Sequence, residues 1–474
     1  GDTYTSIEGL IGSAFNDTLI GDSGNNDLRG GLGADHLDGG AGNDYADYRG
    51  NTNGVPDGAV TADLADPTQN TGSAAGDTYV SIEGLIGSAF NDTLIGDSGI
   101  NVLRGGLGAD RLEGGGGLDF ADYRGSTNGI PDGAVTANLA DPTQNTGSAA
   151  GDTYVSIEGL IGSNLNDTLI GDAGNNSLRG GLGADHLDGG AGFDFAEYFN
   201  STEGLTVNLA TPANNTGEAS GDTFTSIEGI LGSQFNDTLV GDAGDNVLIG
   251  AGGGDVLNGG PGGTDTASYQ YGSVSRGVTA SLAAPGINTG DAAGDTYVSI
   301  ENLQGTGFAD HLVGDAGANT LIGLGGNDVL DGLGGNDTLV GDAGSDTFVY
   351  APGDGADRIV DFTAAGAGHD RVDLTGFTKI RSLDDVLADA SQVSADTVLN
   401  FGNGDTLTLQ GVTKTSLAED DFLLKANTPN DFNADSMSDL LWQNANGAVS
   451  IWEMNGASTI SNPTLATNPG LAWH

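Results

Sequence analysis

The stretch GGLGADHLDGGAGNDYAD, residues 30–47, contains one nine-residue pattern twice, as GGLGADHLD and then GGAGNDYAD. Glycine occupies positions one, two and four, an aspartate position six, and an apolar residue position eight. Glycines at these positions suit a tight turn that visits positive φ and directs carbonyl oxygens inward, and the aspartate adds a carboxylate to those oxygens. The last three residues favour a very short strand with one inward side chain. Each nonapeptide is therefore predicted to form one turn with one metal ligand, followed by one strand.

The nonapeptide occurs four times without insertion between Gly12 and Asp47, as GSAFNDTLI, GDSGNNDLR, GGLGADHLD and GGAGNDYAD. Two nonapeptides are predicted to make one coil of the chain. Stacking of such coils brings the first turn over the third and the second over the fourth, which leaves room for a cation between stacked turns.

A longer repeat contains these blocks. The segment GDTYTSIEGLIGSAFNDTLIGD begins at Gly1, and close copies begin at Gly76, Gly151, Gly221 and Gly294. The expected fold is all-β, a parallel β-roll or β-helix solenoid of five modules with a C-terminal cap. The expected boundaries are modules at 1–75, 76–150, 151–220, 221–293 and 294–350, a cap at 351–425, and a separate fragment at 426–474.

The expected ligands are all oxygens, which favours a hard cation, and a flexible set of carboxylates and carbonyls favours calcium over magnesium. Position six is asparagine in the second turn of every module, and one extra residue precedes Asp265. We expect roughly 10–15 calcium ions. The predicted metal ligands are Asp17, Asn26, Asp35, Asp44, Asp92, Asn101, Asp110, Asp119, Asp167, Asn176, Asp185, Asp194, Asp237, Asn246, Asp255, Asp265, Asp310, Asn319, Asp328, Asp337, Asp346 and Asp357, with Asp431, Asn433, Asp435 and Asp439 near the C-terminus.

The repeats GGLGADHLD, GGAGNDYAD, GGLGADRLE and GLGGNDTLV closely resemble the RTX (repeats-in-toxin) nonapeptide GGxGxDxUx, over roughly residues 1–425. This resemblance implies a parallel β-roll that is unfolded at low calcium, exported by a type I secretion machine and folded outside the cell by calcium. Residues 351–425 are similar to the closing segment common at the ends of RTX proteins. The stretch DFNADSMSDLLWQNANGAVSIWEMNG is similar to one FG-GAP or VCBS blade, although Ser436 replaces the usual glycine of its calcium loop.

Longer segments of different composition separate successive nonapeptide blocks. Within them, AVTADLA (59–65), GLTVNLA (204–210) and GVTASLA (277–283) alternate apolar and polar residues, which predicts strands with one buried face. We expect the solenoid to continue through each such segment as two wider coils with protruding loops. A hairpin packed on the side of the roll is the alternative. Near the C-terminus, SLDDVLADAS (382–391) has an N-cap serine and helical spacing of its apolar residues, which predicts a helix.

Composition limits the partners. Thirteen basic against 66 acidic side chains give a net charge of −53, which makes nucleic acid an unsuitable partner. There is no cysteine, so disulfides and thiolate metal sites are excluded. No apolar run approaches the length of a membrane span, which predicts no membrane insertion, and the N-terminus lacks a basic and apolar signal segment. Because Gly1 stands on a repeat boundary, we expect the sequence to be part of a longer protein.

Catalytic motifs are not recognisable. His36, His186 and His311 each occupy position seven of a nonapeptide, an outward strand position, and no HExxH or GxSxG motif is present. The sequence therefore predicts no enzyme activity. The main hypothesis is a secreted calcium-dependent structural or adhesive protein of a bacterial surface, matrix or extracellular fibre, with possible self-association or a surface glycan or protein ligand. The alternative is the calcium-folding secretion module of a type I exported hydrolase, protease or epimerase whose catalytic domain lies outside this sequence.

Overall fold

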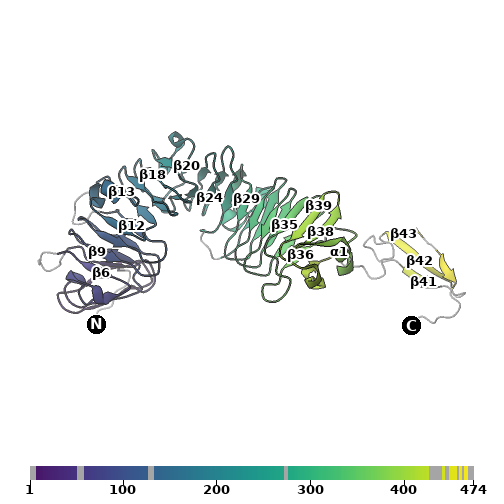
Figure 1. The fold of residues 1–474 in the computed structure, drawn as a ribbon, viewed down its shortest axis with the longest axis horizontal. Coiled ribbons are helices and arrows are strands. Elements are labelled where there is room, and N and C mark those ends of the chain that lie inside the picture. The colour runs from purple at the N-terminus through teal and green to yellow at the C-terminus, as the bar shows by residue number, and fades with distance from the viewer. Residues whose placement is uncertain are drawn as a thin grey trace. The chain divides into compact units, whose positions relative to one another are not determined.

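The computed structural model describes residues 7–50, 58–125, 133–271 and 276–425, and four further strands, β41 (Leu440–Gln443), β42 (Ala448–Asn455), β43 (Ser458–Ser461) and β44 (Thr464–Thr467). The chain forms two compact units (Figure 1). Unit 1 contains Gly1–Ser273 and Pro285–Ile300, and unit 2 contains Val274–Ala284 and Glu301–His474.

Unit 1 has one continuous parallel sheet, here called face A, in which consecutive coils supply neighbouring strands. Its strands are β1 (Gly9–Ile11), β3 (Asp27–Arg29), β5 (Tyr45–Asp47), β8 (Gly84–Ile86), β10 (Val102–Arg104), β12 (Phe120–Asp122), β15 (Gly159–Ile161), β17 (Ser177–Arg179), β19 (Phe195–Glu197), β22 (Gly229–Leu231), β24 (Val247–Ile249) and β26 (Thr266–Ser268).

The opposite side of unit 1, here called face B, is divided into four short parallel sheets. They consist of β2 (Thr18–Ile20), β4 (His36–Asp38) and β7 (Thr78–Val80); of β6 (Thr61–Asp63), β9 (Thr93–Ile95), β11 (Arg111–Glu113) and β14 (Thr153–Val155); of β13 (Thr136–Asn138), β16 (Thr168–Ile170), β18 (His186–Asp188) and β21 (Thr223–Thr225); and of β20 (Thr206–Asn208), β23 (Thr238–Val240), β25 (Val256–Asn258) and β28 (Thr296–Val298).

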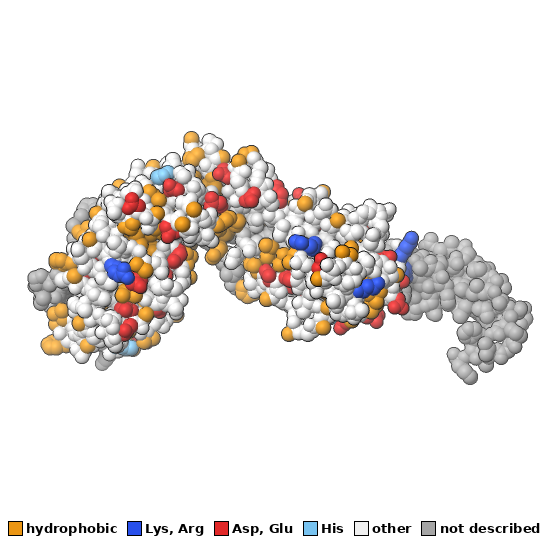
Figure 2. All heavy atoms as spheres, in the orientation of Figure 1, with side chains coloured by type: hydrophobic (Ala, Val, Ile, Leu, Met, Phe, Trp, Pro, Cys, Tyr) orange, Lys and Arg blue, Asp and Glu red, His pale blue; other side chains and the backbone are white. Residues whose placement is uncertain are grey.

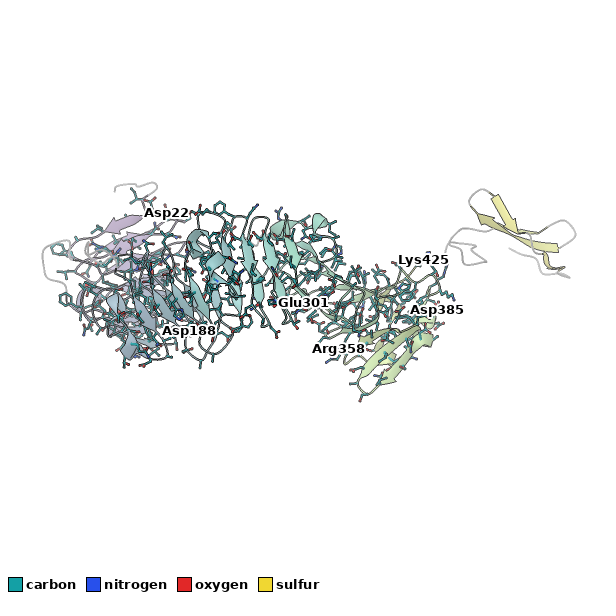
Figure 3. All side chains as sticks on the ribbon, turned by 90° about the horizontal axis from the view of Figure 1, so that it is seen from above. Asp22, Asp188, Glu301, Arg358, Asp385 and Lys425 are labelled. Carbon is teal, nitrogen blue, oxygen red and sulfur yellow. The ribbon has the colours of Figure 1, made fainter. Side chains whose placement is uncertain are left out.

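The register confirms the predicted coil of two nonapeptides. Leu10 pairs with Leu28 and Leu19 with Leu37, so each residue pairs with the one two nonapeptides further along the chain. The middle residue of each strand points inward, so that Leu28 and Leu37 are fully buried. The core is therefore a thin double row of aliphatic side chains, as position eight of the repeat predicts. The outer side chains project from the coils, as at Asp188 in unit 1 and Arg358 in unit 2 (Figure 3).

The segment between two nonapeptide blocks forms one long coil on face A, because β5 pairs directly with β8. The expectation of two wider coils is therefore wrong for face A. On face B the same segment supplies two strands: β7 stacks on the preceding β4, and β6 stacks on the following β9. Two 3₁₀ turns, Pro67–Gln69 and Gly72–Ala74, connect β6 with β7. The strands predicted at 59–65, 204–210 and 277–283 are confirmed as β6, β20 and β27 (Thr279–Ser281).

This arrangement gives the two faces unequal numbers of strands. The module from Gly76 to Ala150 contributes three strands to face A, β8, β10 and β12, but four to face B, β7, β9, β11 and β13. Because neighbouring strands keep a similar spacing, face A is the shorter side. Unit 1 is therefore expected to curve toward face A.

Unit 2 has the same coil pattern and a closing segment of its own. One sheet contains β29 (Asn302–Gln304), β31 (Thr320–Ile322), β33 (Thr338–Val340), β35 (Ala356–Ile359), β39 (Asp405–Leu409), β38 (Asp396–Gly402) and β37 (Ala390–Val393), and the other contains β27, β30 (His311–Asp315), β32 (Val329–Leu333), β34 (Thr347–Val349), β36 (Arg371–Asp373) and β40 (Phe422–Leu423).

The cap of unit 2 begins where pairing changes from parallel to antiparallel, at β37, β38 and β39. The predicted helix is confirmed as α1 (Leu383–Asp389), and the hydroxyl of Ser382 accepts the Asp385 N–H at its N-terminus. A cap of this kind covers the end of the core and the last strand edge. Strands β41 to β44 pair antiparallel, but the expected ligands Asp431, Asn433, Asp435 and Asp439 lie outside the described residues.

Candidate metal centre

The position-six carboxylates stack in columns along both edges of the roll. Oδ1 of Asp35 accepts the backbone N–H of Asp17 at 2.8 Å, and Oδ1 of Asp44 accepts that of Asn26 at 2.7 Å. In both pairs the two residues are separated by two nonapeptides, so each bond joins neighbouring coils. The same bond recurs in unit 2, where Oδ1 of Asp346 accepts the Asp328 N–H at 2.9 Å. One oxygen of each such carboxylate thus fixes the turn of the coil before it.

The other oxygen of these carboxylates is buried without a hydrogen-bond partner. Asp35 and Asp110, for example, are each only 1% exposed. A buried unpaired oxygen of this kind is costly unless a cation or a donor compensates it, so the geometry fits a cation. Ten predicted ligands among the described residues share this property of Oδ2: Asp35, Asp44, Asp110, Asp119, Asp185, Asp194, Asp255, Asp328, Asp337 and Asp346.

Glycine at position one is required by this arrangement. A methyl group placed on Gly30 would lie 2.2 Å from Oδ2 of Asp35, and one placed on Gly12 would lie 2.4 Å from the carbonyl oxygen of Gly30 in the next coil. Gly31 and Gly33 have φ of 101° and 144°, a region that side-chain-bearing residues avoid. The turns thus bring carboxylate and carbonyl oxygens close together, the donor set that calcium prefers.

Burial and mutual repulsion raise the pKa of these carboxyls. Burial, together with the neighbouring Asp152, raises the pKa of Asp110 to about 8. Burial also raises the pKa of Asp185 and Asp255 to about 8, with further contributions from adjacent carboxylates. The ionised form is therefore unfavourable in the protein alone. A divalent cation between the turns would reverse this preference.

The first carboxylate of each block is different, because side-chain and backbone donors already satisfy it. Oδ2 of Asp92 accepts the Ser88 N–H at 2.5 Å, and Oδ1 accepts the Val60 N–H at 2.6 Å and the Ser88 hydroxyl at 3.1 Å. Serine or threonine at position two supplies these donors in every block. The equivalent pairs are Asp17 with Ser13, Asp167 with Ser163, Asp237 with Ser233, and Asp310 with Thr306.

The asparagines at position six also use their side chains within the protein. Oδ1 of Asn101 accepts the Asp97 N–H at 2.7 Å, and its amide nitrogen donates to the Glu83 carbonyl at 3.3 Å. The amide suits this place better than a carboxylate because it offers a donor as well as an acceptor. The same two bonds occur at Asn176, Asn246 and Asn319, and at Asn26 the amide nitrogen donates to the Ile7 carbonyl instead of a glutamate carbonyl.

The blocks described above match a known repeat family. The family model of the RTX calcium-binding nonapeptide repeat (4 copies) matches residues 11–46, 86–121, 161–196 and 231–264, and overlapping copies match 304–339, 313–348 and 322–356. These blocks are RTX repeats. They bind calcium. The RTX matches in the described residues contain all ten carboxylates with a buried unpaired Oδ2.

No curated protein sequence matches the chain. Among solved structures, the crystal structure of the extracellular lipase LipA from Serratia marcescens is similar at 22% identity, over 41% of this chain and 39% of the lipase chain, with a TM-score of 0.20. The matched region thus spans less than half the length of that lipase.

Sequence reasoning missed the acidic residues that continue the columns between RTX blocks. Oδ1 of Asp77 accepts the Asp35 N–H at 2.8 Å, and its Oδ2 accepts the Tyr48 hydroxyl at 3.1 Å. Oε2 of Glu83 accepts the Asp44 N–H at 2.9 Å. The signal was present, because D-T-Y at residues 77–79 repeats the acidic-x-apolar spacing of the nonapeptide. Asp152, Asp222 and Asp295 occupy the place of Asp77 in later modules.

Two remaining predicted ligands, Asp265 and Asp357, continue the second column, which contains Asn26 and Asp44. Oδ1 of Asp265 accepts the Asn246 N–H at 2.8 Å despite the extra residue before it, and Oδ1 of Asp357 accepts the Asp337 N–H at 2.9 Å. The column therefore tolerates one inserted residue before Asp265 and two before Asp357.

Two described histidines, His36 and His369, have partners other than the position-six carboxylates. Nδ1 of His36 lies 3.0 Å from the Thr78 hydroxyl, a partner on the neighbouring strand. In unit 2, Nε2 of His369 lies 2.8 Å from Oδ1 of the fully buried Asp421, whose Oδ2 accepts the Ala418 N–H. This contact fastens the segment before β36 to the one before β40. None of the described helices is long and apolar enough to cross a membrane.

Proposed function

We propose that this chain is a secreted, calcium-dependent structural and adhesive β-roll protein of a bacterial surface, matrix or extracellular fibre. The observation that carries the proposal is the set of ten stacked carboxylates whose second oxygen is buried without a partner. Such a set makes calcium part of the fold. The RTX repeats are structural calcium-binding elements.

Calcium would act by removing repulsion and joining coils. The net charge of −53 and the columns of aspartates oppose folding, while a core of only two rows of side chains offsets little conformational entropy. On the face drawn in Figure 2, acidic side chains are spread widely and basic ones are few. The chain is therefore expected to stay unfolded where calcium is scarce, to pass a type I secretion machine in that state, and to fold outside the cell.

The individual calcium ligands follow from the side chains that remain available. The ten carboxylates with an unpaired Oδ2 are proposed as ligands, together with Asp265 and Asp357, which continue the second column. The first-turn aspartates and the position-six asparagines are proposed to shape the turns instead, because their oxygens already accept hydrogen bonds. About one ion for each available carboxylate agrees with the expected 10–15 ions.

A structural role fits the remainder of the chain. The described part of residues 7–425 consists of repeated coils and a cap, and His36 and His186 each contact a threonine of the neighbouring strand rather than a nucleophile. Repeated coils present similar side chains at regular intervals, which suits many weak contacts with neighbouring chains or with a surface ligand. No enzymatic activity is proposed for residues 1–474.

The test compares the purified chain with calcium and with a chelator, by circular dichroism, small-angle scattering and electron microscopy. The expected result is a disordered chain without calcium and a rigid, protease-resistant one with it, which self-associates or attaches to surfaces and disperses on chelation. A spectrum that the chelator leaves unchanged would contradict the proposal. Turnover of esters, peptides or polysaccharides by this segment would favour the enzyme hypothesis instead.

A further inference from the structure

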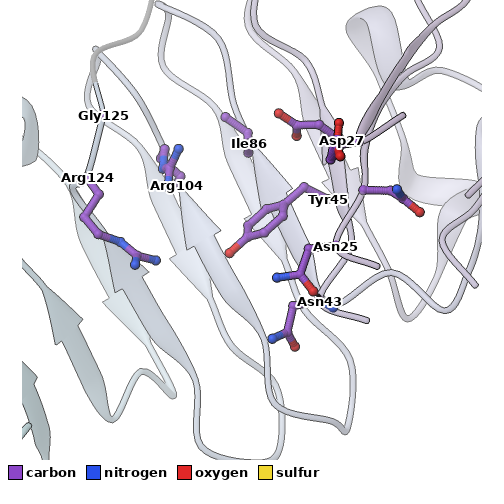
Figure 4. Close-up of a pocket in the computed structure, with 10 residues that line it drawn as sticks. Asn25, Asp27, Asn43, Tyr45, Ile86, Arg104, Arg124 and Gly125 are labelled. Carbon is purple, nitrogen blue, oxygen red and sulfur yellow. Dashed lines mark hydrogen bonds between the residues drawn. The ribbon is translucent and has the colours of Figure 1, made fainter. Parts of the chain in front are cut away.

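The outer surface of face A in unit 1 contains a groove that crosses several coils. Two adjoining hollows of about 490 and 600 Å³ share Asn25, Asn43, Tyr45 and Arg124 in their linings. Figure 4 shows Tyr45 on β5 and Arg104 on β10, with Ile86 of the intervening strand β8 between them and the guanidinium of Arg124 directed toward the Tyr45 ring. Asn25 and Asn43 lie beside the ring at the turns. The groove lies on the side toward which unit 1 is expected to curve.

Aromatic rings recur on this surface at one strand position. Tyr45, Phe120 and Phe195 each begin the last strand of an RTX block, and three strand spacings separate one from the next, about 14 Å. Each ring rests on a glycine of the following strand: a methyl group on Gly84 would lie 2.3 Å from the Tyr45 ring. Gly159 and Gly229 hold Phe120 and Phe195 in the same way.

Three arginines of unit 1 also line the groove, Arg104, Arg124 and Arg179. That unit contains six basic side chains, Arg29, Arg49, Arg104, Arg111, Arg124 and Arg179. All but Arg111 belong to the outer surface of face A, where they pair with carboxylates of the same surface. Asp47 and Asp122 are each shared by two arginines. The groove is therefore close to neutral on a strongly acidic molecule.

Several donors along the groove are not used within the described residues. Nε of Arg104 and Nε of Arg179 are buried and have no hydrogen-bond partner. Arg179 is only 8% exposed, and its guanidinium lies over the rings of Phe199 at 4.2 Å and Phe120 at 5.7 Å. Arg179, Phe120 and Phe199 all line the larger hollow. Phe120 itself is buried, whereas Tyr45 is partly exposed and Phe199 is 40% exposed, so Tyr45 and Phe199 are the rings that the groove presents beside these arginines.

We propose that this groove binds a neutral polysaccharide chain that lies across the strands of face A. This inference rests on the proposed adhesive function and names the class of its ligand. Pyranose rings stack on aromatic faces, and their hydroxyls accept hydrogen bonds from the arginine and asparagine donors. The carboxylate partners of the arginines and the net charge of −53 disfavour a polyanion. Because residues of three modules line the groove, binding requires the calcium-folded roll.

The test is affinity electrophoresis of the calcium-loaded chain in gels that contain hydroxyethyl cellulose, xylan, galactomannan, dextran or dextran sulfate. Tyr45→Ala and Arg124→Gln address the groove. Phe90→Ala is the matched control, since Phe90 is an exposed aromatic residue at 46% in a turn and does not line the groove. Circular dichroism with calcium verifies that each variant folds.

The expected result is retardation by at least one of the four neutral polymers, about tenfold weaker binding for Tyr45→Ala and Arg124→Gln, and unchanged binding for Phe90→Ala. The proposal is overturned if the folded protein binds none of the neutral polymers, if it binds dextran sulfate alone, or if the folded Tyr45→Ala variant binds as well as the unsubstituted chain. In those cases a chain that still folds and self-associates with calcium leaves the proposed structural function intact.

Discussion

The substitution Asp110→Asn separates the two effects that a calcium-binding carboxylate has on stability. In the calcium-free fold, burial and Asp152 raise the pKa of Asp110 from 3.8 to about 8. That difference corresponds to an upper limit of roughly 6 kcal/mol for keeping the carboxylate ionised. The new amide nitrogen would lack an acceptor, which costs about 1–3 kcal/mol. The substitution is therefore expected to stabilise the calcium-free fold, by at most roughly 3–5 kcal/mol.

The pH dependence of this effect has a definite sign. Because the pKa of the folded state is the higher one, the folded calcium-free chain binds more protons than the unfolded chain between pH 3.8 and about 8. The penalty for ionising Asp110 is fully present above about pH 8 and disappears below pH 3.8. The gain from Asp110→Asn should therefore be largest at alkaline pH and absent in acid.

In calcium the same substitution is expected to destabilise the protein. If Asp110 is a ligand, the variant folds with one ion fewer, and the free energy of unfolding gains about 1.4 kcal/mol less for each tenfold rise in calcium. Urea unfolding at calcium concentrations from about 0.1 to about 10 mM measures this slope.

The control is Asp92→Asn, one coil earlier in the same column. Donors of Ser88 and Val60 already satisfy the Asp92 carboxylate. This variant should lose about 1–3 kcal/mol at every calcium concentration and keep the slope. Equal slopes for Asp110→Asn and the unsubstituted chain, or a reduced slope for Asp92→Asn, would refute the assignment of the ligands.

Three further outcomes follow from the contacts. Gly84→Ala should lower the free energy of unfolding of the calcium-loaded protein by about 1–3 kcal/mol, because the Tyr45 ring occupies the space of the new methyl group. The control Gly133→Ala, which has open space around it, should change that free energy by no more than about 0.5 kcal/mol. Thermal unfolding compares the two variants, and equal effects would show that the Tyr45 ring does not lie against Gly84. His36→Ala should stay within about 0.5 kcal/mol, and the loss of a bound ion on this substitution would contradict its place outside the metal sites. The calcium concentration for half-saturation should rise as the pH falls from 8 toward 5, because the carboxyl of Asp185, with a pKa of about 8, takes up a proton that competes with the ion. Isothermal titration at several pH values measures this concentration, and a calcium affinity that does not change with pH would contradict the prediction.

The local chemistry of the repeat was sufficient to predict the coil. The spacing from Asp35 to Leu37 places an aspartate or asparagine in the turn and an inward residue in the strand of each nonapeptide, and both positions are as expected. The same periodicity could not separate Asp110 from Asp92, although both occupy position six. The difference depends on where the hydroxyl and N–H of Ser88 point, which only the folded turn shows.

Features that join distant segments were not predictable from the periodicity. Strand β6 pairs with β9 and strand β7 pairs with β4, each across part of the long segment between blocks, so a period of two nonapeptides gives no indication of either partner. The groove is a further case. Tyr45 and Arg124 belong to different modules, and they line the same groove only because the coils between them in the sequence stack in order. Asp77, in contrast, could have been predicted from the pattern, because it precedes Tyr79 by the spacing that separates position six from position eight of the nonapeptide.

The central claim is that calcium binds at the position-six carboxylates whose second oxygen has no protein partner. A crystal structure of the chain grown in calcium, with ions located by their anomalous scattering, tests it most directly. The expected result is an ion in contact with Oδ2 of each of the ten, including Asp35, Asp110 and Asp337, and none held by the serine-bonded carboxylate of Asp92. Fewer than about five ions in the structure, or ions placed mainly at the first-turn aspartates, would contradict the account.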